Sequence, residues 1–156
     1  MNWDAIGAAG EIIGALAVVF SLVYLAAQIR AQNRQARSAA MHDIAAGYRD
    51  AVATFAHYEL ADLMVRANHD YESLTDAEKF QLMSAIQRIM RVWEESYFQR
   101  TSNNLDSHIW EPMVAQYSAY MSMPAIQRFW KLRSKFFNED FRRFVDNNET
   151  TDYTLE

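Results

Sequence analysis

Two neighbouring glutamates, Glu94 and Glu95, are the pair of side chains best suited by type to acid–base chemistry. They follow Trp93, and Trp110 lies in the next segment of the chain. Consecutive residues of a helix point about 100° apart, so the two carboxyl groups cannot both share the surroundings of Trp93. The pattern therefore favours an ion pair between one glutamate and Arg91 or an arginine of another helix. A ligand pocket is the alternative, with a wall formed by Trp93, Glu94 and Trp110.

No other arrangement of residues is typical of catalysis or of cofactor binding. The four histidines form no HExxH motif and no pair four residues apart, which argues against a metal site. Cysteine is absent, which excludes disulfides, thiolate nucleophiles and cysteine-ligated metals. There is no glycine-rich phosphate loop and no GxSxG motif. The sequence thus predicts no metal and no cofactor, and it favours a protein that is not an enzyme.

Glu11 is a third acidic residue of interest, because it directly precedes a long apolar segment. Ionisable residues within membrane-spanning helices usually face other helices or water, and they often mark ion or proton paths. In a symmetric oligomer, Glu11 would form an acidic ring that favours cations, and Gln28 would lie on the same side of the helix. The alternative, which we prefer, is that Glu11 fixes the register between packed helices or contacts lipid head groups.

The element that positions Glu11 is an apolar stretch near the N-terminus. Residues 12–27 contain no charged side chain, and Arg30, Arg34 and Arg37 follow them. A helix of that length covers about 24 Å of a membrane core about 30 Å thick, so a spanning helix has to extend to about residues 5–29. The three arginines then predict that the N-terminus is outside and that the rest of the chain is cytoplasmic.

A cleaved signal peptide is the main competing interpretation of this stretch. Signal peptides begin with a positively charged region. Here the residues before the apolar stretch include Asp4 and Glu11 but no Lys or Arg. We therefore expect the stretch to be a retained membrane anchor.

Small residues gather on one side of the expected anchor helix. They recur every three or four positions, as Gly7, Gly10, Gly14, Ala17 and Ser21. The spacing of Gly10 and Gly14 is a GxxxG motif, which allows two membrane helices to approach closely. The pattern predicts that the anchor self-associates; a chance spacing in a helix rich in glycine and alanine is the alternative.

The remainder of the chain is expected to be helical, because it contains one glycine, Gly47, and two prolines, Pro112 and Pro124. Apolar residues at helical spacing predict that the first helix continues to about residue 58. Further helices are expected at 60–66, 76–101, 109–120, 124–137 and 138–145. Thr75 and Glu78 have the spacing of a capping box, and Pro112 is expected in the first turn of its helix.

The helix expected at 124–137 has aromatic residues on one face and Arg128, Lys131 and Lys135 on the other. Such a helix suits the surface of an anionic membrane or an acidic partner. More often, the aromatic side chains of such a helix form part of a core and the cations face solvent. We favour that second interpretation here.

Several stretches of the chain resemble an uncharacterised bacterial family of small membrane proteins. GAAGEIIGALAVVFSLVYLAAQIR, residues 7–30, is similar to the family's N-terminal pattern GAxGExxGAxAVVxSLxYLAxQIR. The later stretches that look similar are LTDAEKF, VWEESYFQ, LDSHIWEP, MPAIQRFWKLRSKFF and EDFRRFVDNN. The resemblance implies a single-pass protein of a bacterial inner membrane with a helical domain, and it brings no activity with it.

The sequence as a whole predicts an all-α protein with three parts. These are a transmembrane anchor over residues 1–30, a cytoplasmic helical domain over 31–146, and a polar, acidic, frayed tail over 147–156. The preferred function is a non-enzymatic membrane protein that self-associates through its anchor and presents the helical domain as an assembly or scaffold module. The alternatives are an oligomeric cation channel with a ring of Glu11, and a membrane-tethered ligand sensor or enzyme.

The expected partners follow from the anchor and from the charge of the chain. Membrane lipid surrounds the anchor, and further copies of the chain pack against it. A membrane or cytoplasmic protein of unknown identity is a further expected partner. Nucleic acid is not expected, because the 156 residues carry a formal net charge of −5.

Overall fold

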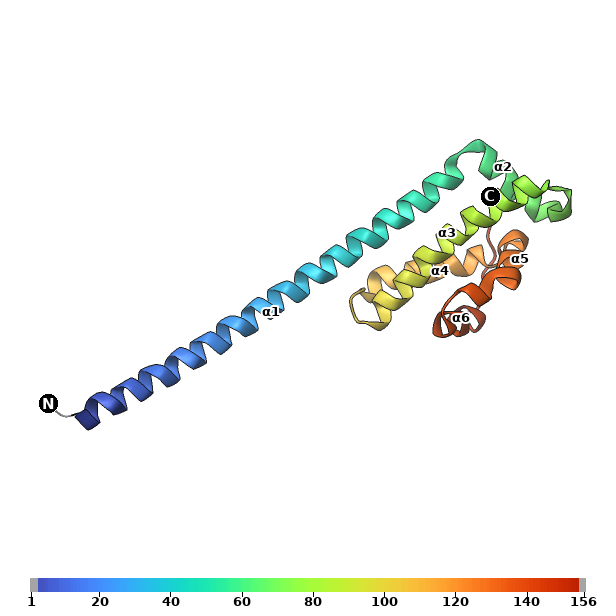
Figure 1. The fold of residues 1–156 in the computed structure, drawn as a ribbon. Helices are drawn as coiled ribbons and strands as arrows, with labels where there is room; N and C mark the ends of the chain where they lie inside the picture. The colour runs from blue at the N-terminus through green and yellow to red at the C-terminus, as the bar shows by residue number, and fades with distance from the viewer. Residues whose placement is uncertain (1–2, 155–156) are drawn as a thin grey trace. The chain divides into compact units, whose positions relative to one another are not determined.

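The computed structural model describes residues 3–154, which form helices and no strand. The elements in chain order are α1 (Trp3–Ala56), α2 (Tyr58–Asp70), the 3₁₀ turn η1 (Tyr71–Ser73), α3 (Asp76–Thr101), α4 (Ser107–Tyr120), α5 (Pro124–Arg133), the 3₁₀ turn η2 (Ser134–Phe136) and α6 (Glu139–Asp146) (Figure 1). Contacts divide the chain into two units, Met1–Ala39 and Ala40–Glu156, and the division falls within α1. The all-α prediction is confirmed for the described residues.

The first unit consists of the N-terminal part of α1, and most of its side chains are exposed. Every described side chain from Trp3 to Arg30 is exposed. The helix includes a window of 18 residues with a mean hydropathy of 2.3. By length and composition, α1 is therefore the helix of the described chain that could cross a membrane.

The second unit, which we call the helical unit, includes the last turns of α1. Ile44 and Ala51 are buried on one side of this part of α1. Gly47 lies between them on the same side, and a Cβ built on it would be 3.4 Å from Cγ2 of Val92 in α3. α1 thus passes close to α3 at Gly47, with room for a methyl group but not for a large side chain.

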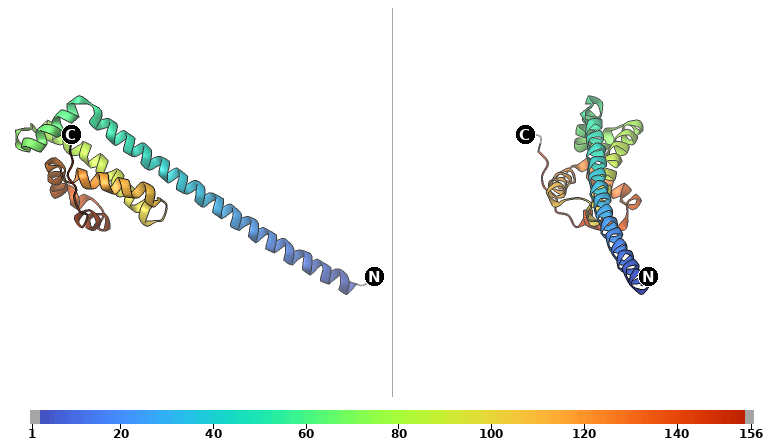
Figure 2. Two further views of the ribbon diagram at one scale, coloured as in Figure 1. Left: turned by 180° about the vertical axis from the view of Figure 1, so that it is seen from behind. Right: turned by 90° about the vertical axis from the view of Figure 1, so that its left-hand side faces the viewer.

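The core of the helical unit is built around Trp93 in the middle of α3. Its ring stacks on Tyr117 of α4, with centroids 4.4 Å apart and planes 2° apart. Phe141 and Phe144 of α6 meet the same ring edge-on, at 5.4 and 5.8 Å. α3 and α4 lie side by side in each view of the fold (Figures 1 and 2). One aromatic cluster therefore joins α3, α4 and α6.

Local capping signals fix where the helices of this unit begin. Thr75 and Glu78 form the expected capping box at the start of α3. Pro124 is at the first position of α5, and the side chain of Asn138 accepts a hydrogen bond from the backbone N–H of Asp140 in α6. These three predictions of helix starts are confirmed.

Glu78 also links α3 to α2 through an ion pair. Arg66 Nη2 donates to Glu78 Oε1 at 2.6 Å, and Arg66 Nε donates to Asp62 Oδ2 at 2.8 Å. The hydrogen bond from Arg66, followed by those from Thr75, lowers the pKa of Glu78 to about 2. Glu78 therefore both caps α3 and holds α2 against it.

Three sequence predictions about element positions are wrong. α2 continues to Asp70 and is followed by η1, whereas a loop was expected from residue 67. Pro112 is the sixth residue of α4 and not part of its first turn, because α4 begins at Ser107. A proline there removes the N–H that would bond to the carbonyl of His108. α5 ends at Arg133, earlier than expected, and η2 follows it.

The aromatic face expected along residues 124–137 is part of the core. Ile126, Phe129, Trp130 and Phe137 are buried, whereas Lys131 and Lys135 are exposed. This confirms the interpretation that the aromatic residues form core and the lysines face solvent. Phe80 departs from the expected pattern of α3, since it is 72% exposed. It lines a hollow of about 240 Å³ near the start of α3, together with Met83 and Leu132.

The described part of the tail makes contacts with α4 and with the residues that follow it. The backbone N–H of Thr151 donates to the carbonyl of Ser118 at 3.3 Å. The backbone N–H of Tyr153 donates to Ser122 Oγ at 3.1 Å, and its ring lies 5.6 Å from that of Tyr120. The tail packs because an aromatic residue within this polar segment finds an apolar surface.

Candidate functional site

The small-residue face predicted for self-association lies open along α1. No other group lies within 4 Å of a Cβ built on Gly7, Gly10 or Gly14. Further along, Ser21 Oγ donates to the carbonyl of Ala17 at 2.8 Å, so the hydroxyl bonds within its own helix. The face is therefore free to receive another helix, and the proposed packing stays a prediction.

The polar residues of the same segment are also exposed. Glu11 faces solvent, and Gln28 Nε2 lies 3.4 Å from the hydroxyl of Tyr24, one turn earlier. Arg30, Arg34 and Arg37, which were used to orient the anchor, are exposed as well. The structure of one chain brings none of these residues to a partner, so the acidic ring and the register contact both stay predictions.

Glu94 is a structural residue of the helical unit. It is mostly buried and forms an ion pair with Arg91, three residues earlier. Its other oxygen accepts a hydrogen bond from the backbone N–H of Asn138 at 2.7 Å. Arg91 in turn donates to the carbonyl of Phe136 at 2.9 Å. The expected ion pair is confirmed, and it ties α3 to the turn that precedes α6.

The two tryptophans that were candidates for a pocket wall lie in the aromatic cluster. Trp93 is fully buried between Tyr117 and α6. Trp110 is half-buried, with its ring 5.5 Å from that of Phe144 and 6.4 Å from that of Tyr97. Neither tryptophan lines the cavity described next, and neither does Glu94.

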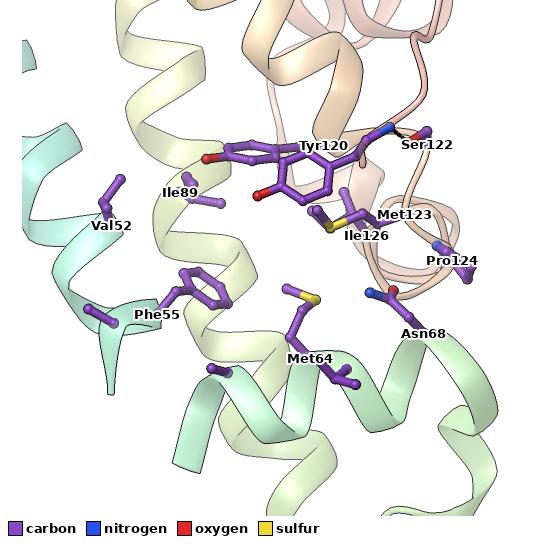
Figure 3. Close-up of a pocket in the computed structure, with 14 residues that line it drawn as sticks. Val52, Phe55, Met64, Asn68, Ile89, Tyr120, Ser122, Met123, Pro124 and Ile126 are labelled. Atoms are coloured by element: carbon purple, nitrogen blue, oxygen red, sulfur yellow. Dashed lines mark hydrogen bonds between the residues drawn. The ribbon is translucent and has the colours of Figure 1, made fainter. Parts of the chain in front are cut away.

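The helical unit contains an apolar cavity of about 580 Å³ (Figure 3). Its walls come from the last turns of α1, from α2, α3, the connection of α4 to α5, and the tail. Of its 14 lining residues, none carries a charge; they include Val52, Phe55, Met64, Asn68, Tyr120 and Tyr153. The size lies within the range of about 300–1,000 Å³ that is usual for small-molecule sites.

A few neutral polar groups accompany this apolar lining. Asn68 Oδ1 accepts a hydrogen bond from the backbone N–H of Ala125 at 3.0 Å, at the start of α5. The hydroxyl of Tyr120 accepts one from Gln116 Nε2 at 2.9 Å. Burial, followed by a hydrogen bond with Tyr48, raises the pKa of Tyr120 to about 12, so this hydroxyl stays protonated near neutral pH.

Sequence reasoning missed this cavity for a physical reason. Its residues come from five separate stretches of the chain, and most are ordinary core types at helical spacing. Periodicity shows that such residues face inward, but it does not show where opposing side chains leave space. Asn68 was the one available signal, because an amide among apolar positions of a helix needs a partner.

In the part of the chain that the structure describes, no three His, Asp or Glu side chains are grouped so as to hold a metal ion. The chain matches no protein-family model, no curated protein and no solved structure. The geometry described above is thus the basis for assigning a function.

Proposed function

We propose that the chain is a single-pass inner-membrane protein that self-associates through its anchor and presents the helical unit in the cytoplasm as an assembly module. The observation that carries this proposal is the exposure of the apolar segment. Nine large side chains made only of hydrocarbon between residues 12 and 25 each have more than half of their surface exposed: Ile12, Ile13, Leu16, Val18, Val19, Phe20, Leu22, Val23 and Leu25.

Such exposure is too costly to persist in water. Burying one side chain of this kind stabilises a protein by roughly 1.5–3 kcal/mol, so nine together represent on the order of 10–30 kcal/mol. This is the free energy available from moving the segment out of water, since no part of the chain buries it. The apolar segment therefore requires an apolar environment. A lipid bilayer is the environment that suits an uncharged helix of this length.

The charges around the segment support one orientation. Arg30, Arg34 and Arg37 follow it, whereas Asp4 and Glu11 precede it. Arginines flanking a membrane helix are retained on the cytoplasmic side. The helical unit is accordingly on that side, and the N-terminus is on the other.

Self-association follows from the surface that the helix would present to lipid. Lipid covers large apolar side chains well, so these provide little drive for two membrane helices to meet. Helices pair instead where small residues allow close backbone contact. Gly10 and Gly14 provide such a surface, and a Cβ built on either has open space around it.

The test is the oligomeric mass of the full chain in lipid nanodiscs, measured by native mass spectrometry. We expect a defined oligomer for the natural sequence and its loss in Gly10→Leu and Gly14→Leu, because leucine keeps the backbones apart. Ala26→Leu is the matched control, since it lies about 140° around the helix from the centre of the small-residue face. A monomeric natural protein would contradict the proposal.

The same preparation tests the cation channel. If the oligomer is a ring of four or more chains, the protein is transferred from nanodiscs to lipid vesicles. Ion flux across the vesicle membrane is then measured for the natural chain and for Glu11→Gln. A cation flux in the natural chain that is lost in Glu11→Gln would show that the protein is a channel and would contradict the proposed assembly module. Intact assembly without flux supports the module.

A further inference from the structure

We infer that the cavity of the helical unit binds a single-chain lipid whose head group is uncharged and accepts a hydrogen bond, such as a monoacylglycerol. The apolar part of the cavity would hold the acyl chain. One amide group, on Asn68, would recognise the head group (Figure 3).

The lining selects against charged ligands. None of the 14 residues around the cavity is charged. An ionised carboxylate or phosphate that entered would lose its hydration without gaining a counter-charge, which is strongly unfavourable. Fatty-acid anions and phospholipids are therefore disfavoured relative to neutral lipids of the same chain length.

Asn68 provides a hydrogen-bond donor of known orientation. A backbone N–H can only donate, so the atom of the Asn68 amide that bonds to the N–H of Ala125 must be the oxygen. The amide nitrogen is then the end that points toward the cavity (Figure 3). Its N–H groups suit a carbonyl or hydroxyl oxygen of the ligand.

Apolar side chains at the rim would admit the lipid chain. Val52, Val65 and Tyr153 line the cavity and remain 39%, 46% and 41% exposed. Inside, Met64 and Met123 have flexible thioether side chains, which adapt to an irregular ligand such as an acyl chain. The cavity thus offers an apolar entrance, an adaptable interior and a few neutral polar groups, of which the Asn68 amide is the donor that the head group would meet.

The inference rests on the proposed function for one point, the supply of lipid from the membrane. The experiment uses the full chain in nanodiscs that contain a monoacylglycerol with a diazirine on its acyl chain. Light attaches the probe to nearby residues, and tandem mass spectrometry of the digested protein locates it. Labels within residues 12–27 show that lipid contacts the anchor, whereas labels on peptides with Met64 or Met123 show that lipid enters the cavity. The membrane anchor and the lipid-binding cavity are therefore tested separately.

The expected result is strong labelling of the cavity peptides by the monoacylglycerol. The matched diazirine fatty acid, at about pH 9 where its carboxylate is ionised, should label them roughly tenfold less. Labelling confined to residues 12–27 would overturn the inference. Equal labelling by the two probes would overturn the assignment of an uncharged head group.

Two variants test the residues themselves. Met64→Trp fills the cavity and should reduce its labelling by roughly tenfold, whereas Leu132→Trp, on the exposed surface outside the cavity, should not change it. Asn68→Asp keeps the oxygen that accepts from Ala125 but replaces the donor by an anion. It should reduce labelling by roughly five- to tenfold while helicity, measured by circular dichroism, stays unchanged. Full labelling in both Met64→Trp and Asn68→Asp would contradict the inference.

Discussion

The glycines of α1 differ in what surrounds them, although they belong to one helix. A side chain added at Gly10 or Gly14 would meet open space, whereas one added at Gly47 would touch Val92. The apolar side chains follow the same division: those of residues 12–25 are exposed, and those of the helical unit form a core. The last turns of α1 thus pack within the chain, whereas the side chains of its N-terminal part stay exposed.

This contrast separates two kinds of stability that experiments can alter one at a time. Substitutions in the helical unit should change its unfolding and leave the proposed oligomer of the anchor intact. Substitutions on the small-residue face of the anchor should do the reverse. The next three predictions test this division, and they are ordered by the size of the expected effect.

The largest effect is expected for Trp93→Ala in the aromatic core. Trp93 is fully buried and contacts rings from α4 and α6, so its removal leaves a large cavity. We expect the helical unit to lose about 3–5 kcal/mol of unfolding free energy. Chemical denaturation followed by tryptophan fluorescence and circular dichroism measures the loss. An oligomer that dissociates together with this loss would show that the two units are not independent.

Gly47 gives an intermediate effect with opposite signs for two substitutions. Gly47→Ala adds a Cβ at ordinary contact distance, 3.4 Å from Val92, and should stabilise the helical unit by up to about 1 kcal/mol through helix propensity. Gly47→Leu should destabilise it by about 1–3 kcal/mol through overpacking. Thermal unfolding of both variants, with Gly14→Leu as the control, measures this. An unchanged unfolding temperature in Gly47→Leu would contradict the close contact of α1 with α3.

The smallest effect is a loss of stability in acid, caused by Glu78. Its pKa is lowered from 4.5 to about 2 in the folded protein, so the unfolded chain binds a proton first as the pH falls. The stabilisation is complete above about pH 4.5 and is lost as the pH falls toward 2. Denaturation at a series of pH values should show this slope, and Glu78→Gln should reduce it. The oligomer of the anchor should not follow the Glu78 titration.

The sequence predicted those features of the fold that depend on short-range signals. The capping box at Thr75, the proline that begins α5 and the cap at Asn138 each need only a few neighbouring residues. The exposure of Phe80 was not predictable in that way. At about 100° per residue, its side chain points roughly 120–160° away from those of Leu82, Ile86 and Trp93, and only the tertiary structure shows that these three define the buried face of α3.

The candidate sites show the same difference between short-range signals and tertiary contacts. The ion pair of Glu94 with Arg91 lies within one helix, and its spacing was visible in the sequence. The cavity depends on how α1, α2 and the tail meet α3, so its position required coordinates. The packing of the anchor depends on a second molecule, and it therefore awaits the nanodisc experiment.

The contact of Tyr153 with the cavity has a consequence for how ligand preference could evolve. This residue is held by a hydrogen bond from its backbone and is 41% exposed, so its side chain contributes little to the core. A smaller side chain at this position would lengthen the space for an acyl chain, and a larger one would shorten it, at small cost in folding. Selectivity for chain length can thus be adjusted almost independently of the scaffold.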